Sequence, residues 1–89
     1  MIARRAVVHG DVQGVGFRWW TARQAERLGV CGWVDNRPDG TVEVHAEGGT
    51  AGVAALLTAL QDGPRFARVT RVTVTDDEPA GWSGFEVEP

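Results

Sequence analysis

Three glycines lie within the seven residues from Gly10 to Gly16, between a β-like segment and an amphipathic segment that begins at Phe17. Glycines allow consecutive backbone N–H groups to turn toward one point, and the start of a helix adds free N–H donors and the positive end of the helix dipole. Arg18 falls in the first turn of the expected helix, where its guanidinium can hold two oxygens of a phosphate. The loop therefore indicates an anion site.

Other kinds of chemistry find little support in the residue types. All nine cationic side chains are arginine, which excludes Schiff-base chemistry by a lysine and a lysine-type phosphate loop. The glycines match neither the Walker pattern nor the dinucleotide fingerprint. Ser83, the only serine, lies in a turn-like stretch without the strand, turn and helix of a nucleophile elbow. His9, Cys31 and His45 are too far apart in sequence for a typical zinc site, so we expect no metal.

Hydrophobic spacing and turn residues divide the chain into alternating strands and helices. The expected strands cover Ile2–Val8, Val30–Asn36, Thr41–Glu47, Ala67–Thr75 and a short tail around Phe85 and Val87, and the expected helices cover Phe17–Leu28 and Thr50–Gln61. The hydrophobic register changes within the fourth strand, which predicts a β-bulge near Thr70. The order β-α-β-β-α-β plus a tail strand predicts an α+β fold of the ferredoxin-like split β-α-β type, with an antiparallel sheet and both helices on one face.

Length and composition indicate one soluble domain over residues 1–89. The chain is 43% hydrophobic, has a net charge of -3 and contains no apolar run near the roughly 20 residues that a membrane span needs. An acidic chain is a poor candidate for binding nucleic acid. Cys31 is the only cysteine, and the N-terminal residues lack a signal-peptide pattern, so we expect a cytoplasmic monomer. The arginine-only, alanine-rich and glycine-rich usage suggests a bacterial source with a high-GC genome.

Two motifs resemble the acylphosphatases, enzymes that hydrolyse the carboxyl-phosphate bond of acyl phosphates. The stretch Gly10–Arg18 reproduces the family's Gly-x-Val-Gln-Gly-Val-x-Phe-Arg run in full. The stretch Gly32–Val42, followed by Gly48, is similar to the family's Gly-aromatic-small-x-Asn-x-x-x-Gly-x-Val pattern. Asp35 departs from the family, in which that position is more often basic, polar or small. An acidic group beside Asn36 could weaken the attraction of phosphate or alter local pairing, but it leaves Arg18 and Asn36 themselves unchanged.

The resemblance implies an acylphosphatase that needs no metal or cofactor. It implies that Arg18 binds the phosphate, that Asn36 holds the attacking water, and that backbone N–H groups cradle the phosphate oxygens, namely those of Gln13, Gly14, Val15, Gly16, Phe17 and Arg18. The leaving carboxylate has a conjugate acid with a pKa of about 4 to 5, so no general acid is needed. Asn36 can hydrogen-bond the water without repelling the phosphate, whereas a carboxylate would repel it. The expected small-molecule partners are an acyl phosphate and inorganic phosphate.

Two other functions remain open from the sequence. One is a non-catalytic phosphate-binding or regulatory module of the same fold, as occurs within larger maturation proteins for metalloenzymes, although the chain is short for such a fusion. The other is an RNA-binding module, which the acidic charge and the lack of alternating aromatic residues on a central strand disfavour. Trp19 and Trp20 are adjacent and must point to different sides of the helix, so we expect one to pack on the sheet and the other to be partly exposed near the loop.

Overall fold

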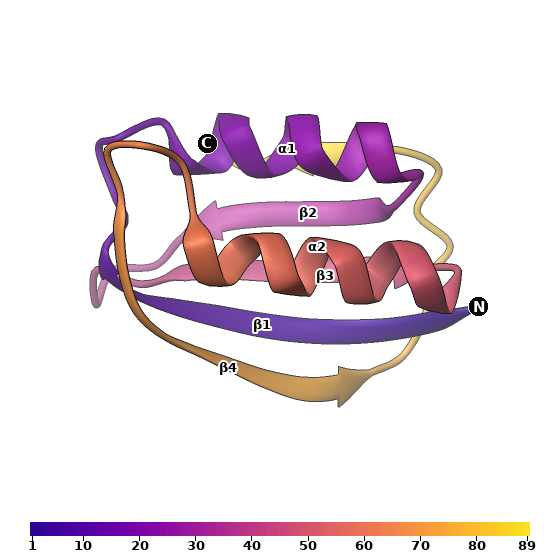
Figure 1. Cartoon of the computed structure of the whole chain (residues 1–89). Coiled ribbons are helices and arrows are strands. Elements are labelled where there is room, and N and C mark those ends of the chain that lie inside the picture. The colour runs from indigo at the N-terminus through magenta and orange to yellow at the C-terminus, as the bar shows by residue number, and fades with distance from the viewer.

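The computed structural model describes every residue from Met1 to Pro89. The elements follow in the order β1 (Ile2–Asp11), α1 (Phe17–Leu28), β2 (Cys31–Asn36), β3 (Val42–Gly48), α2 (Thr50–Asp62), β4 (Arg68–Asp77) and β5 (Phe85–Val87). The strands form one sheet with the order β4-β1-β3-β2-β5, and both helices lie on the same face of it (Figure 1). This arrangement confirms the ferredoxin-like fold that the sequence predicts.

The four long strands pair antiparallel, β1 with both β3 and β4, and β2 with β3. The bulge expected near Thr70 is present, because His9 pairs with Arg71 and Gly10 with Val69, which leaves Thr70 without a partner. The tail strand β5 pairs parallel to β2, so the sheet as a whole is mixed. The parallel pairing was not predicted, since three residues carry no signal for the direction in which they will pair.

The core lies between the sheet and the two helices. From α2 it receives Val53, Leu56 and Leu60, which recur at helical spacing and are fully buried. Phe17 at the start of α1 is also buried, and its ring meets that of Trp20 edge to face with 5.5 Å between centroids. Trp20 packs partly buried against this core, whereas its neighbour is mostly exposed, so the expected division of the two tryptophans is confirmed.

Helix α1 begins and ends at glycines in the left-handed conformation. Gly16 precedes it with φ 80°, and Gly29 follows it with φ 71° and donates its N–H to the carbonyls of Ala25 and Glu26. Such termini are local features of the chain, and the observed bounds of α1 coincide with the predicted bounds. With 12 and 13 residues, α1 and α2 are both too short to span a membrane.

Two strands are longer than the sequence predicts. β1 continues through Gly10 to Asp11, and β4 continues to Asp77. The reason is tertiary, because the added residues of each strand pair with the other strand: Asp11 lies opposite Arg68, and Ala3 lies opposite Asp77. Gly10 has φ 129°, and a side chain there would meet the Arg68 carbonyl, so this strand position requires glycine.

Candidate active site

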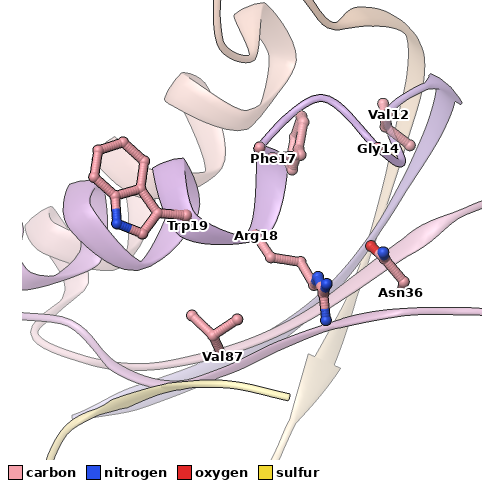
Figure 2. A pocket seen from close by; sticks show the side chains of 8 residues that line it. Val12, Gly14, Phe17, Arg18, Trp19, Asn36 and Val87 are labelled. Atoms are coloured by element: carbon pink, nitrogen blue, oxygen red, sulfur yellow. The ribbon is translucent and has the colours of Figure 1, made fainter. Parts of the chain in front are cut away.

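The β1–α1 loop, the end of β2 and the tail strand β5 meet around one pocket of about 170 Å³ (Figure 2). It is lined by Val12, Gly14, Gly16, Phe17, Arg18, Trp19, Asn36 and Val87. Arg18 is the only arginine in this lining, and no carboxylate belongs to it. The pocket therefore combines one fixed positive charge with a loop backbone, an amide and apolar walls.

The backbone N–H groups of the loop and of the first turn of α1 are free. No N–H from residue 13 to residue 19 donates a hydrogen bond to a protein acceptor, and the first that does is that of Trp20, which bonds the Gly16 carbonyl at 3.0 Å. Gly14 and Gly16 have φ 76° and 80°, the left-handed conformation that lets the chain turn tightly here. An anion in the pocket would supply the acceptors that these donors lack.

Arg18 leaves the first turn of α1 and extends across the pocket, with its guanidinium between Asn36 and Val87 (Figure 2). Its Nη1 donates a hydrogen bond to the backbone carbonyl of Glu88. Glu88 in turn donates its own N–H to the Val34 carbonyl at 2.9 Å, so the tail of the chain is fixed to β2. This contact between residues 70 positions apart was missed by the sequence analysis, which had no signal for it.

Asn36 is the last residue of β2 and points its amide into the same space as the Arg18 guanidinium (Figure 2). Its Oδ1 is buried and has no hydrogen-bond partner in the protein. Buried polar atoms are nearly always hydrogen-bonded, and an orphaned acceptor costs free energy unless a water or ligand bonds it. Neighbouring strand residues point to opposite faces, so Asp35 faces away from the pocket, and its acidic group does not enter the site.

The loop is tied to the turn that follows Asn36. Gln13 donates from Nε2 to the Arg37 carbonyl at 2.7 Å and to the Thr41 carbonyl at 2.9 Å. Within the turn, Asp39 accepts from the Thr41 hydroxyl at 2.6 Å and from the Thr41 N–H at 3.0 Å, and these two bonds lower the pKa of the Asp39 carboxyl. The Gln13 side chain therefore has a structural role, because its two hydrogen bonds fix the position of the loop relative to Asn36.

A second polar cluster lies on the sheet face that the helices leave open. His45 is only 3% exposed, and its ring nitrogens lie 2.7 Å from Glu47 Oε2 and 2.9 Å from Asp77 Oδ2. Arg5 also bonds Asp77, at 3.2 Å, and links it to Glu43 at 3.1 Å. The sequence analysis missed this cluster, because alternation along a strand does not show whether its polar side is covered.

The two carboxyls that flank His45 bind protons weakly. Burial raises the pKa of Glu47, but hydrogen bonds from Ala80, His45 and Trp82 together outweigh it and hold that pKa below its usual value. The hydrogen bond from His45, with further bonds from the Glu78 N–H and from Arg5, lowers the pKa of Asp77 to about 2. Both carboxylates are therefore charged at neutral pH. None of the residues of this cluster lines the pocket described above.

Fold and pocket together define a small ferredoxin-like protein whose glycine-rich loop presents free backbone N–H groups beside an arginine. The sequence model of the Acylphosphatase family matches residues 4–87. An acylphosphatase of Thermococcus kodakarensis is 55% identical over 80 residues, which cover 90% of this chain and 88% of that protein. An acylphosphatase of Nitrobacter winogradskyi is 49% identical over 86 residues, which cover 97% of this chain and 84% of that protein.

Solved structures agree with the sequence relatives. The crystal structure of acylphosphatase from Bacillus subtilis superposes with a TM-score of 0.96 at 37% identity, and the match covers 100% of both chains. The chain belongs to the acylphosphatase family. Its activity is that of a hydrolase acting on acid anhydrides, the acyl phosphates, as the motifs predict, and a non-catalytic module of the same fold is not favoured.

Proposed function

We propose that Arg18 and Asn36 carry out the hydrolysis and that the backbone N–H groups of residues 13–18 hold the phosphate. The observation that carries this assignment is the unpartnered Asn36 Oδ1, buried beside the Arg18 guanidinium and the free N–H groups of the loop. The N–H groups and Arg18 supply donors and positive charge for the phosphate oxygens. Asn36 Oδ1 accepts a hydrogen bond from the water that attacks phosphorus.

The reaction needs little proton transfer by the protein. As the water oxygen bonds to phosphorus, the bond between phosphorus and the acyl oxygen breaks, and a carboxylate leaves with the electron pair of that bond. Because its conjugate acid has a pKa of about 4 to 5, the carboxylate leaves without being protonated. The water's proton passes to an oxygen of the phosphate. Positioning and charge stabilisation then account for catalysis, and a metal ion is not required by this scheme.

The direct test is the hydrolysis of benzoyl phosphate, followed by loss of ultraviolet absorbance in the presence of excess chelator. We expect turnover by the parent protein and a loss of about 100-fold or more in kcat/KM for Arg18→Ala, as found when one transition-state donor is removed. Arg27→Ala is a matched control, because Arg27 is exposed on the last turn of the same helix. A rate for Arg18→Ala within a few-fold of the parent would refute the assignment, as would loss of activity on chelation.

A second comparison tests the role of Asn36. Asn36→Ala removes the water's partner, and Asn36→Asp adds a negative charge at nearly the same shape. Both should lower kcat by about 100-fold, and the aspartate should also weaken inhibition by inorganic phosphate through charge repulsion. If either variant hydrolysed benzoyl phosphate as fast as the parent, the water would be held elsewhere.

We further propose that residues 1–89 work as a single domain and a monomer, since residues of one chain are sufficient to supply the loop, Arg18 and Asn36 that the reaction scheme needs. The net charge of -3 supports a small-molecule partner rather than nucleic acid, and we propose no contact with membranes. The one cysteine, Cys31, is free, which is typical of a reducing compartment and supports a cytoplasmic location.

A further inference from the structure

The pocket lining includes apolar side chains that remain exposed. Two of its lining residues, Trp19 and Val87, are large hydrophobic side chains that remain 62% and 44% exposed. They come from segments far apart in sequence, the first turn of α1 and the tail strand β5. Since neither belongs to the buried core, their exposed apolar area is left free beside the anion site.

Trp19 is also held in place. The guanidinium of Arg23, one turn further along α1, lies over the indole at 4.8 Å from its centroid. A cation over an aromatic face stabilises the orientation of the ring. An indole that is both ordered and exposed is a ready surface for an apolar or planar group of a ligand, because little conformational entropy is lost on binding.

The direction of the reaction places the acyl group on this surface. In phosphoryl transfer the attacking and leaving oxygens lie roughly in line on opposite sides of phosphorus. With the water at Asn36, the leaving oxygen and the acyl group behind it must point away from Asn36. Figure 2 shows that Trp19 lies on the other side of the Arg18 side chain from Asn36, with Val87 on that side too.

We propose that Trp19 and Val87 form the subsite for the acyl group, and that the preferred substrates carry an apolar, planar acyl group such as an aromatic ring. This inference rests on the proposed roles of Arg18 and Asn36, which fix the line of attack. The phosphate end would be bound by the loop N–H groups and by Arg18, whatever the acyl group. An acyl group of only one methyl, as in acetyl phosphate, would cover little of the indole and gain little from it.

Two substrates that differ only in the acyl group test the proposal. For Trp19→Ala we expect the ratio of kcat/KM for benzoyl phosphate to that for acetyl phosphate to fall about tenfold, mainly through a higher KM for benzoyl phosphate. Trp19→Phe should retain most of the ratio, because it keeps an aromatic face. Val87→Ala should lower the ratio in the same direction by about twofold to threefold.

Phe66→Ala is the matched control. Phe66 is another exposed aromatic residue, 78% exposed, with the Arg65 guanidinium 5.5 Å from its ring centroid, and it does not line the pocket. Its removal should leave the ratio unchanged. An unchanged ratio in Trp19→Ala, whether the two rates stay at the parental level or fall equally, would overturn the subsite.

The Arg18 and Trp19 variants distinguish an error in the acyl subsite from an error in the catalytic assignment. If Arg18→Ala abolishes hydrolysis of both substrates while Trp19→Ala leaves the ratio unchanged, the catalytic assignment stands and only the acyl subsite is wrong. If Arg18→Ala hydrolyses both substrates at the parental rate, the catalytic assignment is wrong, and the in-line argument for the subsite falls with it.

Discussion

The Glu47 carboxylate accepts a hydrogen bond from the backbone N–H of Trp82 at 2.7 Å and so joins the middle strand of the sheet to the connection between β4 and β5. The N–H of Ala80 bonds the same carboxylate at 2.7 Å. This connection runs from β4 at one edge of the sheet to β5 at the other. Because Val87 and Glu88 follow it, Glu47 anchors the segment that completes the pocket and holds Arg18.

Glu47→Gln should destabilise the protein. The side chain is only 1% exposed, and a neutral amide cannot accept from both backbone N–H groups and from His45 as two carboxylate oxygens do. We expect a loss of about 2 to 4 kcal/mol in the free energy of unfolding, measured with urea. Glu86→Gln, on the exposed side of β5, is the control and should change it by less than about 0.5 kcal/mol. Equal effects of the two substitutions would argue against the anchor.

Acid should weaken the fold through the same cluster. The folded-state pKa of Asp77, about 2, lies below that of an unfolded aspartate, so its contribution to stability is fully present above about pH 4 and is lost as the pH falls through about 2. Glu47 acts in the same direction. The urea midpoint of the parent should therefore fall between pH 4 and pH 2. The urea midpoint of Asp77→Asn should fall less than that of the parent over the same pH range. If both midpoints fell equally, Asp77 would not be a source of the acid sensitivity.

Gln13→Ala should affect activity more than stability. The substitution removes both bonds from the loop to the Arg37 and Thr41 carbonyls, while the core remains intact. We expect kcat/KM for benzoyl phosphate to fall about tenfold, because the N–H groups would no longer be fixed relative to Asn36. The unfolding free energy should fall by only about 1 kcal/mol. Gln61→Ala, exposed on α2, is the control, and equal kinetics in both variants would show that the two bonds do not position the loop.

Gly32→Ala should be strongly destabilising. Gly32 has φ 139°, and a Cβ there would lie 1.8 Å from the backbone carbonyl oxygen of His45 on the paired strand. Since backbone must move to relieve this contact, we expect a loss of about 3 kcal/mol or more. Gly84→Ala is the control, because a Cβ at Gly84 meets nothing within 4 Å and its φ is not positive. Thermal unfolding of the two variants would separate them, and similar midpoints would show that β2 relaxes easily at Gly32.

Local patterns were sufficient for much of the fold. The bounds of α1 follow from the glycines on either side of it and from its apolar spacing, which are properties of a short stretch of chain. The bulge at Thr70 follows from a break in the alternation of Ala67, Val69, Val72 and Val74. The sequence also placed Arg18 at a helix start and Asn36 at a strand end, and the structure brings both into one pocket.

The rest depended on tertiary contacts between distant residues. The parallel pairing of β5, the bond from Arg18 to Glu88 and the burial of Glu47 all arise because the chain after β4 crosses to the other edge of the sheet. The alternation in β3 is the same whether its polar side meets water or that chain, so sequence periodicity alone predicts an exposed face. Thus the sequence by itself determined the loop, the helices and the residues suited to bind phosphate. Only the tertiary structure decided that Glu88 orients Arg18 and that Val87 lines the pocket, because these contacts join segments about 70 residues apart.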